Sequence, residues 1–217
     1  MFITQLIRLW SENSYKTAII LILVGALIYF VALATSRFVI RVSPNYSKER
    51  KRNKIYQGVA AFCTAAIILW FGVLSMETYK ALAFFLLLFY ASICDIEERS
   101  VSNFVSVQLL ILGLVNVDIQ TLVKNVLAGG AIFAFMFVAG MIANGKLGGA
   151  DVKIVGACAF VLGLQASIAG LIAGLLAAVI ITKIIMRKKE SDEQRLPLVP
   201  YLSAGFFISY MVTNILL

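Results

Sequence analysis

A succession of long apolar runs separated by short polar stretches constrains the fold of this chain more than any other feature. There are eight runs, at Thr17–Ser36, Gln57–Ser75, Ala81–Cys94, Phe104–Val117, Val126–Ala143, Val152–Leu164, Ser167–Met186 and Leu198–Leu216. Hydrophobic residues make up 61% of the 217 residues and charged residues 14%, a balance that excludes an ordinary soluble domain. We therefore expect an all-α, polytopic membrane protein with about eight transmembrane helices.

Three of the eight runs are short for a membrane crossing. A helix that spans the hydrocarbon core needs about 20 apolar residues, with a usual lower limit of about 17. The third, fourth and sixth runs fall below that limit. We expect their helices to extend into the polar flanks, or the protein to thin the bilayer locally.

The basic residues predict the orientation of the chain in the membrane. Most of the 19 lysines and arginines lie in segments 37–56, 95–103, 144–153 and 183–197. Eight crossings place these segments on one side, and basic loops are typical of the cytoplasmic side. We expect a multi-pass protein of the cytoplasmic (inner) membrane with both termini on the extracytoplasmic side. The net charge of +8 then reflects topology and lipid headgroups, and predicts no binding of nucleic acid.

The chain is expected to divide into three parts. Residues 1–36 form an N-terminal segment with a retained first transmembrane helix, residues 37–56 a basic cytoplasmic loop, and residues 57–217 a seven-helix domain. There is no histidine, and the three cysteines lie far apart without a CxxC pair. This pattern is typical of neither a zinc site nor a disulfide framework, and we expect no metal and no cofactor.

Two aspartates at the expected cytoplasmic helix ends are the candidate catalytic residues. Asp95 directly follows the third apolar run, and Asp151 opens the sixth. An acid at the membrane boundary is a functional candidate, although an aspartate at a helix N-terminus is also a common cap. The dipole of the sixth helix favours an ionised Asp151, and the C-terminal dipole of the third helix favours a protonated Asp95.

Two carboxyl groups of this kind can act as a base and an acid. One activates a water molecule while the other protonates a carbonyl oxygen, and both share one proton. The pair forms only if the third and sixth helices bring the two side chains together. Nearby Gly145, Gly148 and Gly149 permit positive φ angles and close approach of an extended substrate.

Several motifs resemble those of the type IV prepilin peptidases. "GGADVK" (148–153) is similar to the GxGD motif of that family, and "DIEERSVSN" (95–103) to its second aspartate motif. "LPLVPYLSAG" (196–205) resembles the segment before the last helix of the family, and "VGALIYFVALATSRFVIRVSP" (24–44) resembles its first helix. The chain departs from the family pattern at three places. Ala150 replaces a glycine, Ser102 replaces a proline, and the acidic pair Glu97–Glu98 stands where basic residues are common.

The resemblance implies a membrane aspartic endopeptidase that cleaves the leader of prepilins or pseudopilins at the cytoplasmic face. Asp95 and Asp151 match the catalytic pair of the family. The expected substrate-binding residues are Gly148, Gly149, Lys153, Glu97 and Glu98. Bifunctional members carry a cysteine-rich methyltransferase domain after the first helix, where this chain has only the loop 37–56, so a peptidase without N-methyltransferase activity is implied.

Three other functions are compatible with the same residues. A small transporter would use Asp95 and Asp151 for proton or cation coupling, although transporter sites usually lie at mid-membrane. A metal-dependent enzyme would hold Mg²⁺ with Asp95, Asp151, Glu97 and Glu98. A peptidase-like assembly factor without activity is the third, and the presence of both aspartates argues against it.

Overall fold

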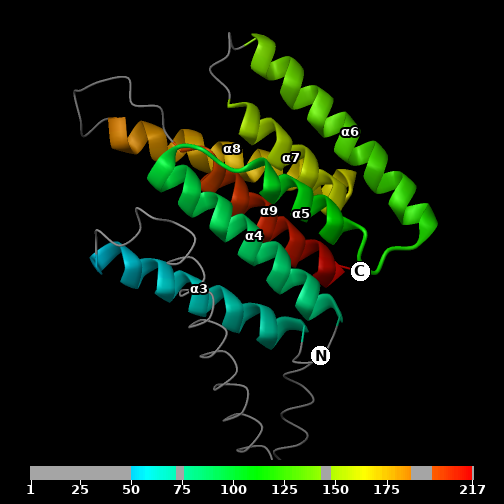
Figure 1. Ribbon diagram of the computed structural model, residues 1–217, viewed down its shortest axis with the longest axis horizontal. Helices are drawn as coiled ribbons and strands as arrows, with labels where there is room; N and C mark the ends of the chain where they lie inside the picture. The colour runs from blue at the N-terminus through cyan, green and yellow to red at the C-terminus, as the bar shows by residue number, and fades with distance from the viewer. Residues whose placement is uncertain (1–49, 72–75, 143–147, 187–196, 217) are drawn as a thin grey trace, which may run out of the picture. The chain divides into compact units, whose positions relative to one another are not determined.

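The computed structural model describes residues 50–71, 76–142, 148–186 and 197–216 (Figure 1). Every regular element in these ranges is a helix, so the all-α class is confirmed for the described chain. The seven helices are α3 (Arg50–Phe71), α4 (Met76–Glu98), α5 (Asn103–Gly113), α6 (Ile119–Ile142), α7 (Gly149–Leu162), α8 (Leu164–Met186) and α9 (Val199–Leu216). They correspond to the second to eighth predicted runs. The first run, Thr17–Ser36, and most of the loop 37–56 lie outside the described residues.

The contacts divide the chain into two compact units, residues 1–86 and 87–217. The first unit includes α3, which buries Ala60, Ile67 and Ile68, and the N-terminal half of α4, which buries Ala81 and Phe84. The second unit contains the C-terminal turns of α4 and all of α5 to α9. Both candidate aspartates therefore lie in the second unit, which is the unit that concerns function.

Helix α7 forms the centre of the second unit. All of its residues from Val152 to Val161 are buried except Lys153. It packs most extensively on α6 and α5 and also contacts α8 and α9, while α8 and α9 pack along each other (Figure 1). A helix that is apolar on nearly all sides fits such a central position.

The expectation that the short runs extend into their polar flanks is right for α4 and wrong for α5 and α7. Helix α4 reaches 23 residues, but α5 has 11 and α7 has 14. At 1.5 Å per residue these two are roughly 16 and 21 Å long, against about 30 Å of hydrocarbon. Local caps stop them: Ser102 accepts the Phe104 N–H at 3.2 Å, and Gly163, with φ 77°, ends α7.

Helices α8 and α9 approach so closely that glycine is required at their crossing. A Cβ atom on Gly205 of α9 would lie 2.6 Å from the Gly174 nitrogen of α8, and one on Gly174 would lie 2.9 Å from the Leu202 Cα. Gly170, one turn earlier on α8, faces Phe206 in the same way. Small residues that let two backbones meet are typical of helix pairs in membranes.

Within the part of the chain that the structure describes, three helices are long and apolar enough to cross a bilayer, and their spans are Met76–Glu98, Ile119–Ile142 and Leu164–Ile184. Helices α6 and α8 also expose many large apolar side chains, among them Leu127, Phe135, Ile172 and Ile180. A soluble protein rarely exposes so much contiguous apolar surface, whereas a lipid-facing helix does. The structure thus supports a membrane protein through these three helices.

Candidate active site

Asp95 lies in the last turn of α4 and caps another helix. Its Oδ2 atom accepts the Val199 N–H at 3.0 Å, and its side chain is only 9% exposed. Val199 is the first residue of α9, and Leu198 before it has no side-chain oxygen that could serve as a cap. The unpaired N–H groups of a helix N-terminus carry partial positive charge. Asp95 therefore lies at the positive end of the α9 dipole as well as at the negative end of the α4 dipole. The expectation for Asp95 considered only α4.

The chain turns sharply after Asp95. Arg99 has φ 51°, and its N–H donates to the Asp95 carbonyl oxygen at 3.1 Å, which ends α4. Burial disfavours a charged Asp95 carboxylate, whereas the Val199 N–H, the charge of Arg99 and the Leu198 backbone favour it. Burial is the largest of these effects, and the contacts with Val199, Arg99 and Leu198 offset it only in part.

Asp151 lies in the first turn of α7, where its Oδ2 atom accepts the Gly148 N–H at 3.2 Å. This contact is the reciprocal half of a capping box, so the aspartate does act as a helix cap. Burial, and next the negative charge of Asp95, raise the pKa of Asp151 to about 6. A carboxyl group with that pKa exchanges its proton near neutral pH, as an acid–base residue must.

The two aspartates thus interact, although their helices are not the main packing partners of each other. Asp95 binds the first turn of α9, and α9 contacts α7, which carries Asp151. The dipole of α7 was expected to favour an ionised Asp151, but burial, and next the charge of Asp95, raise the pKa of Asp151 to about 6. Which of the two aspartates holds the shared proton stays a prediction.

The glycines before Asp151 act differently from the expectation. Gly148 has φ −68° and Gly149 is helical, so neither uses a positive φ, while Gly145 lies outside the described residues. A Cβ atom on Gly148 would lie 2.8 Å from the Asp151 Oδ2 atom, whereas one on Gly149 would meet nothing within 4 Å. Gly148 therefore gives room to the carboxylate, and Gly149 leaves open space at the exposed start of α7.

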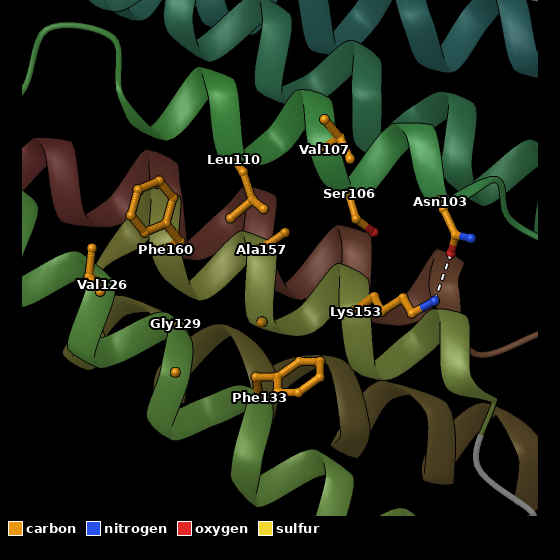
Figure 2. A pocket seen from close by; sticks show the side chains of 12 residues that line it. Asn103, Ser106, Val107, Leu110, Val126, Gly129, Phe133, Lys153, Ala157 and Phe160 are labelled. Carbon is orange, nitrogen blue, oxygen red and sulfur yellow. Dashed lines mark hydrogen bonds between the residues drawn. The ribbon is translucent and has the colours of Figure 1, made fainter.

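Lys153, in the motif at 148–153, forms a hydrogen bond with the motif at 95–103. Its Nζ atom donates to the Asn103 Oδ1 atom at 2.9 Å, which joins the second turn of α7 to the first turn of α5 (Figure 2). Of the two acids in the last turn of α4, Glu98 is exposed and Glu97 is half-buried. Roles of these three residues in substrate binding remain predictions. Among the described residues, Asp95, Asp151, Glu97 and Glu98 do not gather into a group of three or more that could hold a metal ion.

A groove that the sequence analysis missed lies between α5 and α6, with α7 as its floor (Figure 2). Its volume is about 550 Å³. Each helix lines it at positions i, i+3, i+4 and i+7, and the lining residues are Asn103, Ser106, Val107, Leu110, Val126, Gly129, Gly130, Phe133, Lys153, Gly156, Ala157 and Phe160. The paired small residues in two apolar runs, Gly129–Gly130 and Gly156–Ala157, are the signal that could have indicated it.

The comparisons with known proteins agree with the motifs. Residues 82–183 match the model of the type IV leader peptidase family. This region, which is less than half of the chain, is similar to that family. The chain is also 27% identical over 161 residues to the prepilin leader peptidase/N-methyltransferase of Bacillus subtilis (strain 168). The aligned part covers 70% of this chain and 63% of that protein, so the chain spans less than two thirds of the length of this relative. No solved structure matches the chain.

The region that matches the leader peptidase family includes both aspartates, Lys153, Asn103 and the whole groove. It ends at residue 183, before α9 begins. The N–H group that binds Asp95 therefore belongs to a helix beyond the matched region. Helix α9 completes the environment of the site.

Proposed function

We propose that this chain is an aspartic endopeptidase that removes the leader peptide of type IV prepilins or related pseudopilins at the cytoplasmic face of the membrane. One observation carries the proposal. Burial raises the pKa of Asp151 to about 6, and Asp95, 56 positions away in the sequence, lies close enough for its charge to add to this effect. Such a pair is the machinery that an aspartic peptidase requires.

We propose a role for each carboxyl group from its environment. Asp95, held by the N-terminus of α9, is the base that takes a proton from the attacking water. Asp151 holds the shared proton and donates it to the carbonyl oxygen of the scissile peptide, which stabilises the tetrahedral intermediate. Asp95 then gives the proton that it took from the water to the leaving amine, and the hydroxyl of the collapsing intermediate returns its proton to Asp151. The two groups therefore titrate as a unit.

The substrate class follows from charge and from the family. A basic leader is complementary to Glu97 and Glu98 beside the site, and complementary charge steers the encounter of two partners. The open space at Gly149 lets an extended backbone pass the start of α7. The loop 37–56 has no cysteine pair, so we propose peptidase activity without N-methylation.

A cleavage assay in detergent tests the proposal. The wild-type chain is expected to cut a type IV prepilin in the presence of EDTA, and Asp95→Asn and Asp151→Asn are each expected to lose at least about 1,000-fold in kcat, as when an essential acid or base is removed. Asp118→Asn is the control, because Asp118 is an exposed cap of α6 and should leave activity unchanged. Loss of activity in EDTA would support the metal-dependent alternative, and ion-dependent flux in liposomes without cleavage would support a transporter.

A further inference from the structure

The hydrogen bond between Lys153 and Asn103 connects the two segments that carry the aspartates. Lys153 follows Asp151 by two residues in α7, and Asn103, the first residue of α5, follows Asp95 by eight positions. Figure 2 shows the Lys153 side chain extending from α7 to the start of α5, where its Nζ atom donates to the Asn103 Oδ1 atom at 2.9 Å. Each partner of this bond is thus close in the chain to one of the two carboxyl groups.

The turn between Asp95 and Asn103 is short and is held by a hydrogen bond at each end. At its start, the Arg99 N–H donates to the Asp95 carbonyl oxygen at 3.1 Å, and Arg99 adopts φ 51°, a conformation that residues with a side chain rarely take. At its end, Ser102 accepts the Phe104 N–H at 3.2 Å and caps α5. The position of Asn103 is therefore coupled to the end of α4, where Asp95 lies.

Lys153 is exposed on a stretch of α7 whose other residues, from Val152 to Val161, are buried. Residues two apart in a helix point about 200° apart, so Lys153 points away from Asp151 and acts on the helix that carries it. Packing of α5 on α7 already joins these two helices. The additional bond restricts sliding and rotation between them, and so fixes how the segment 95–103 lies against the start of α7.

We propose that Lys153 and Asn103 are a positioning pair that sets the separation of the Asp95 and Asp151 carboxyl groups. Neither residue takes a proton or touches the substrate in this role. Two carboxyl groups share a proton only when they lie close together, and a displacement of about 1 Å can cost about 100-fold in rate. This inference rests on the proposed peptidase function, and it gives Lys153 a role other than the predicted substrate binding.

Steady-state kinetics separates positioning from substrate binding. Lys153→Met and Asn103→Ala each remove the bond, and each should lower kcat on one prepilin at least about 10-fold with KM within about twofold of wild type. The double variant should lose no more than the larger single loss, because both substitutions break the same bond. Lys153→Arg keeps a charged donor and should recover most of kcat. Lys183→Met removes an exposed lysine in the last turn of α8 and should stay within about twofold of wild type.

Two kinetic outcomes would overturn the proposal. A raised KM with unchanged kcat in Lys153→Met, together with wild-type kinetics in Asn103→Ala, would assign Lys153 to substrate binding. Losses of kcat that multiply in the double variant would show that the two side chains act independently of each other.

A distance measurement gives a readout that does not depend on turnover. In a chain in detergent whose native cysteines are replaced by alanine, spin labels at Glu98→Cys and Gly149→Cys report the separation of the end of α4 from the start of α7. Lys153→Met and Asn103→Ala should each broaden the distance distribution, and Lys183→Met should not. Unchanged distributions in the first two variants would contradict the positioning role. If the distributions broaden but the wild type cuts no prepilin, the proposed function fails and the positioning of the two segments stands.

Discussion

At the scale of single residues, the site depends on which partner each carboxyl group has. Asp95 has the N–H of Val199 and the end of α9, while Asp151 has one backbone N–H and a charged neighbour. These differences separate the proton affinities of two chemically identical side chains. The residue type alone does not separate them.

The raised pKa of Asp151 makes a pH-dependent prediction. Its pKa in the folded chain is about 6, above the ordinary 3.8, so between these values the folded chain binds more protons than the unfolded chain. The favourable contribution is complete below about pH 4 and is lost as pH rises through 6. Asp151→Asn should therefore have a higher Tm than wild type at pH 8 and a similar Tm at pH 4.5, measured by thermal unfolding in detergent.

Asp118 supplies a control of opposite sign for that measurement. Hydrogen bonds from Thr121 and Gln120 lower the pKa of Asp118 at the start of α6. Its contribution is present above the ordinary pKa and is lost on acidification, so Asp118→Asn should lower the Tm at pH 8, not raise it. A higher Tm for both variants at pH 8 would point to a general charge effect and contradict the local explanation.

Gly148 and Gly149 are the basis of a second prediction at this scale. Gly148→Ala places a Cβ atom against the Asp151 carboxylate and should lower kcat at least about 10-fold, because small displacements of a catalytic group are costly. Gly149→Ala meets open space and should retain activity within about twofold. Steady-state kinetics with one prepilin substrate measures both. A large loss of kcat/KM in Gly149→Ala alone would instead show that the substrate contacts Gly149.

At the scale of helices, α9 links packing to chemistry. Its glycine crossing with α8 sets the position of its first turn, and that turn holds Asp95. The sequence motif around Pro197, Pro200 and Gly205 therefore has a structural explanation. Gly205 provides close packing, and the start of the helix provides the N–H group that binds the carboxylate.

Substitution at this crossing should destabilise the protein. Gly205→Leu forces side-chain atoms into the backbone of Gly174 and should cost about 1–3 kcal/mol of unfolding free energy, as overpacking does. Ala204→Leu places the same side chain on the exposed face of α9 and should be close to neutral. Thermal unfolding in detergent compares the two. Equal Tm values would contradict the tight crossing.

At the scale of the whole molecule, hydrogen bonds show which helix ends share a face. Asp95 joins the end of α4 to the start of α9, and Lys153 joins the start of α7 to the start of α5. The charge pattern predicts the same grouping and assigns that face to the cytoplasm. The order of the helices predicts that the segment around Asp118, between α5 and α6, belongs to the opposite face.

Cysteine labelling tests this topology. In a chain whose native cysteines are replaced by alanine, Glu98→Cys and Gly149→Cys should react with a membrane-impermeant maleimide only in inverted vesicles. Asp118→Cys should react only in intact spheroplasts. Labelling of Glu98→Cys and Gly149→Cys from opposite sides would contradict the fold, whereas labelling of both in spheroplasts would contradict the predicted orientation alone.

The sequence by itself determined the helical membrane class and the approximate place of each described helix. It also singled out the two aspartates as the candidate catalytic residues. Hydropathy is a property of consecutive residues, and motif spacing is visible without coordinates. The short lengths of α5 and α7 could be predicted only in part. The caps at Ser102 and Gly163 bound these helices before they reach the length of a full membrane span.

Only the tertiary structure decided the environment of each aspartate, why Gly148 and Gly205 are glycines, and that a groove lies between α5, α6 and α7. Each depends on a distance between segments far apart in the chain. The pKa of Asp151 depends first on burial and next on the charge of Asp95, whose carboxylate accepts the Val199 N–H at the start of α9. Electrostatic and steric interactions act through space, so local sequence patterns do not contain them.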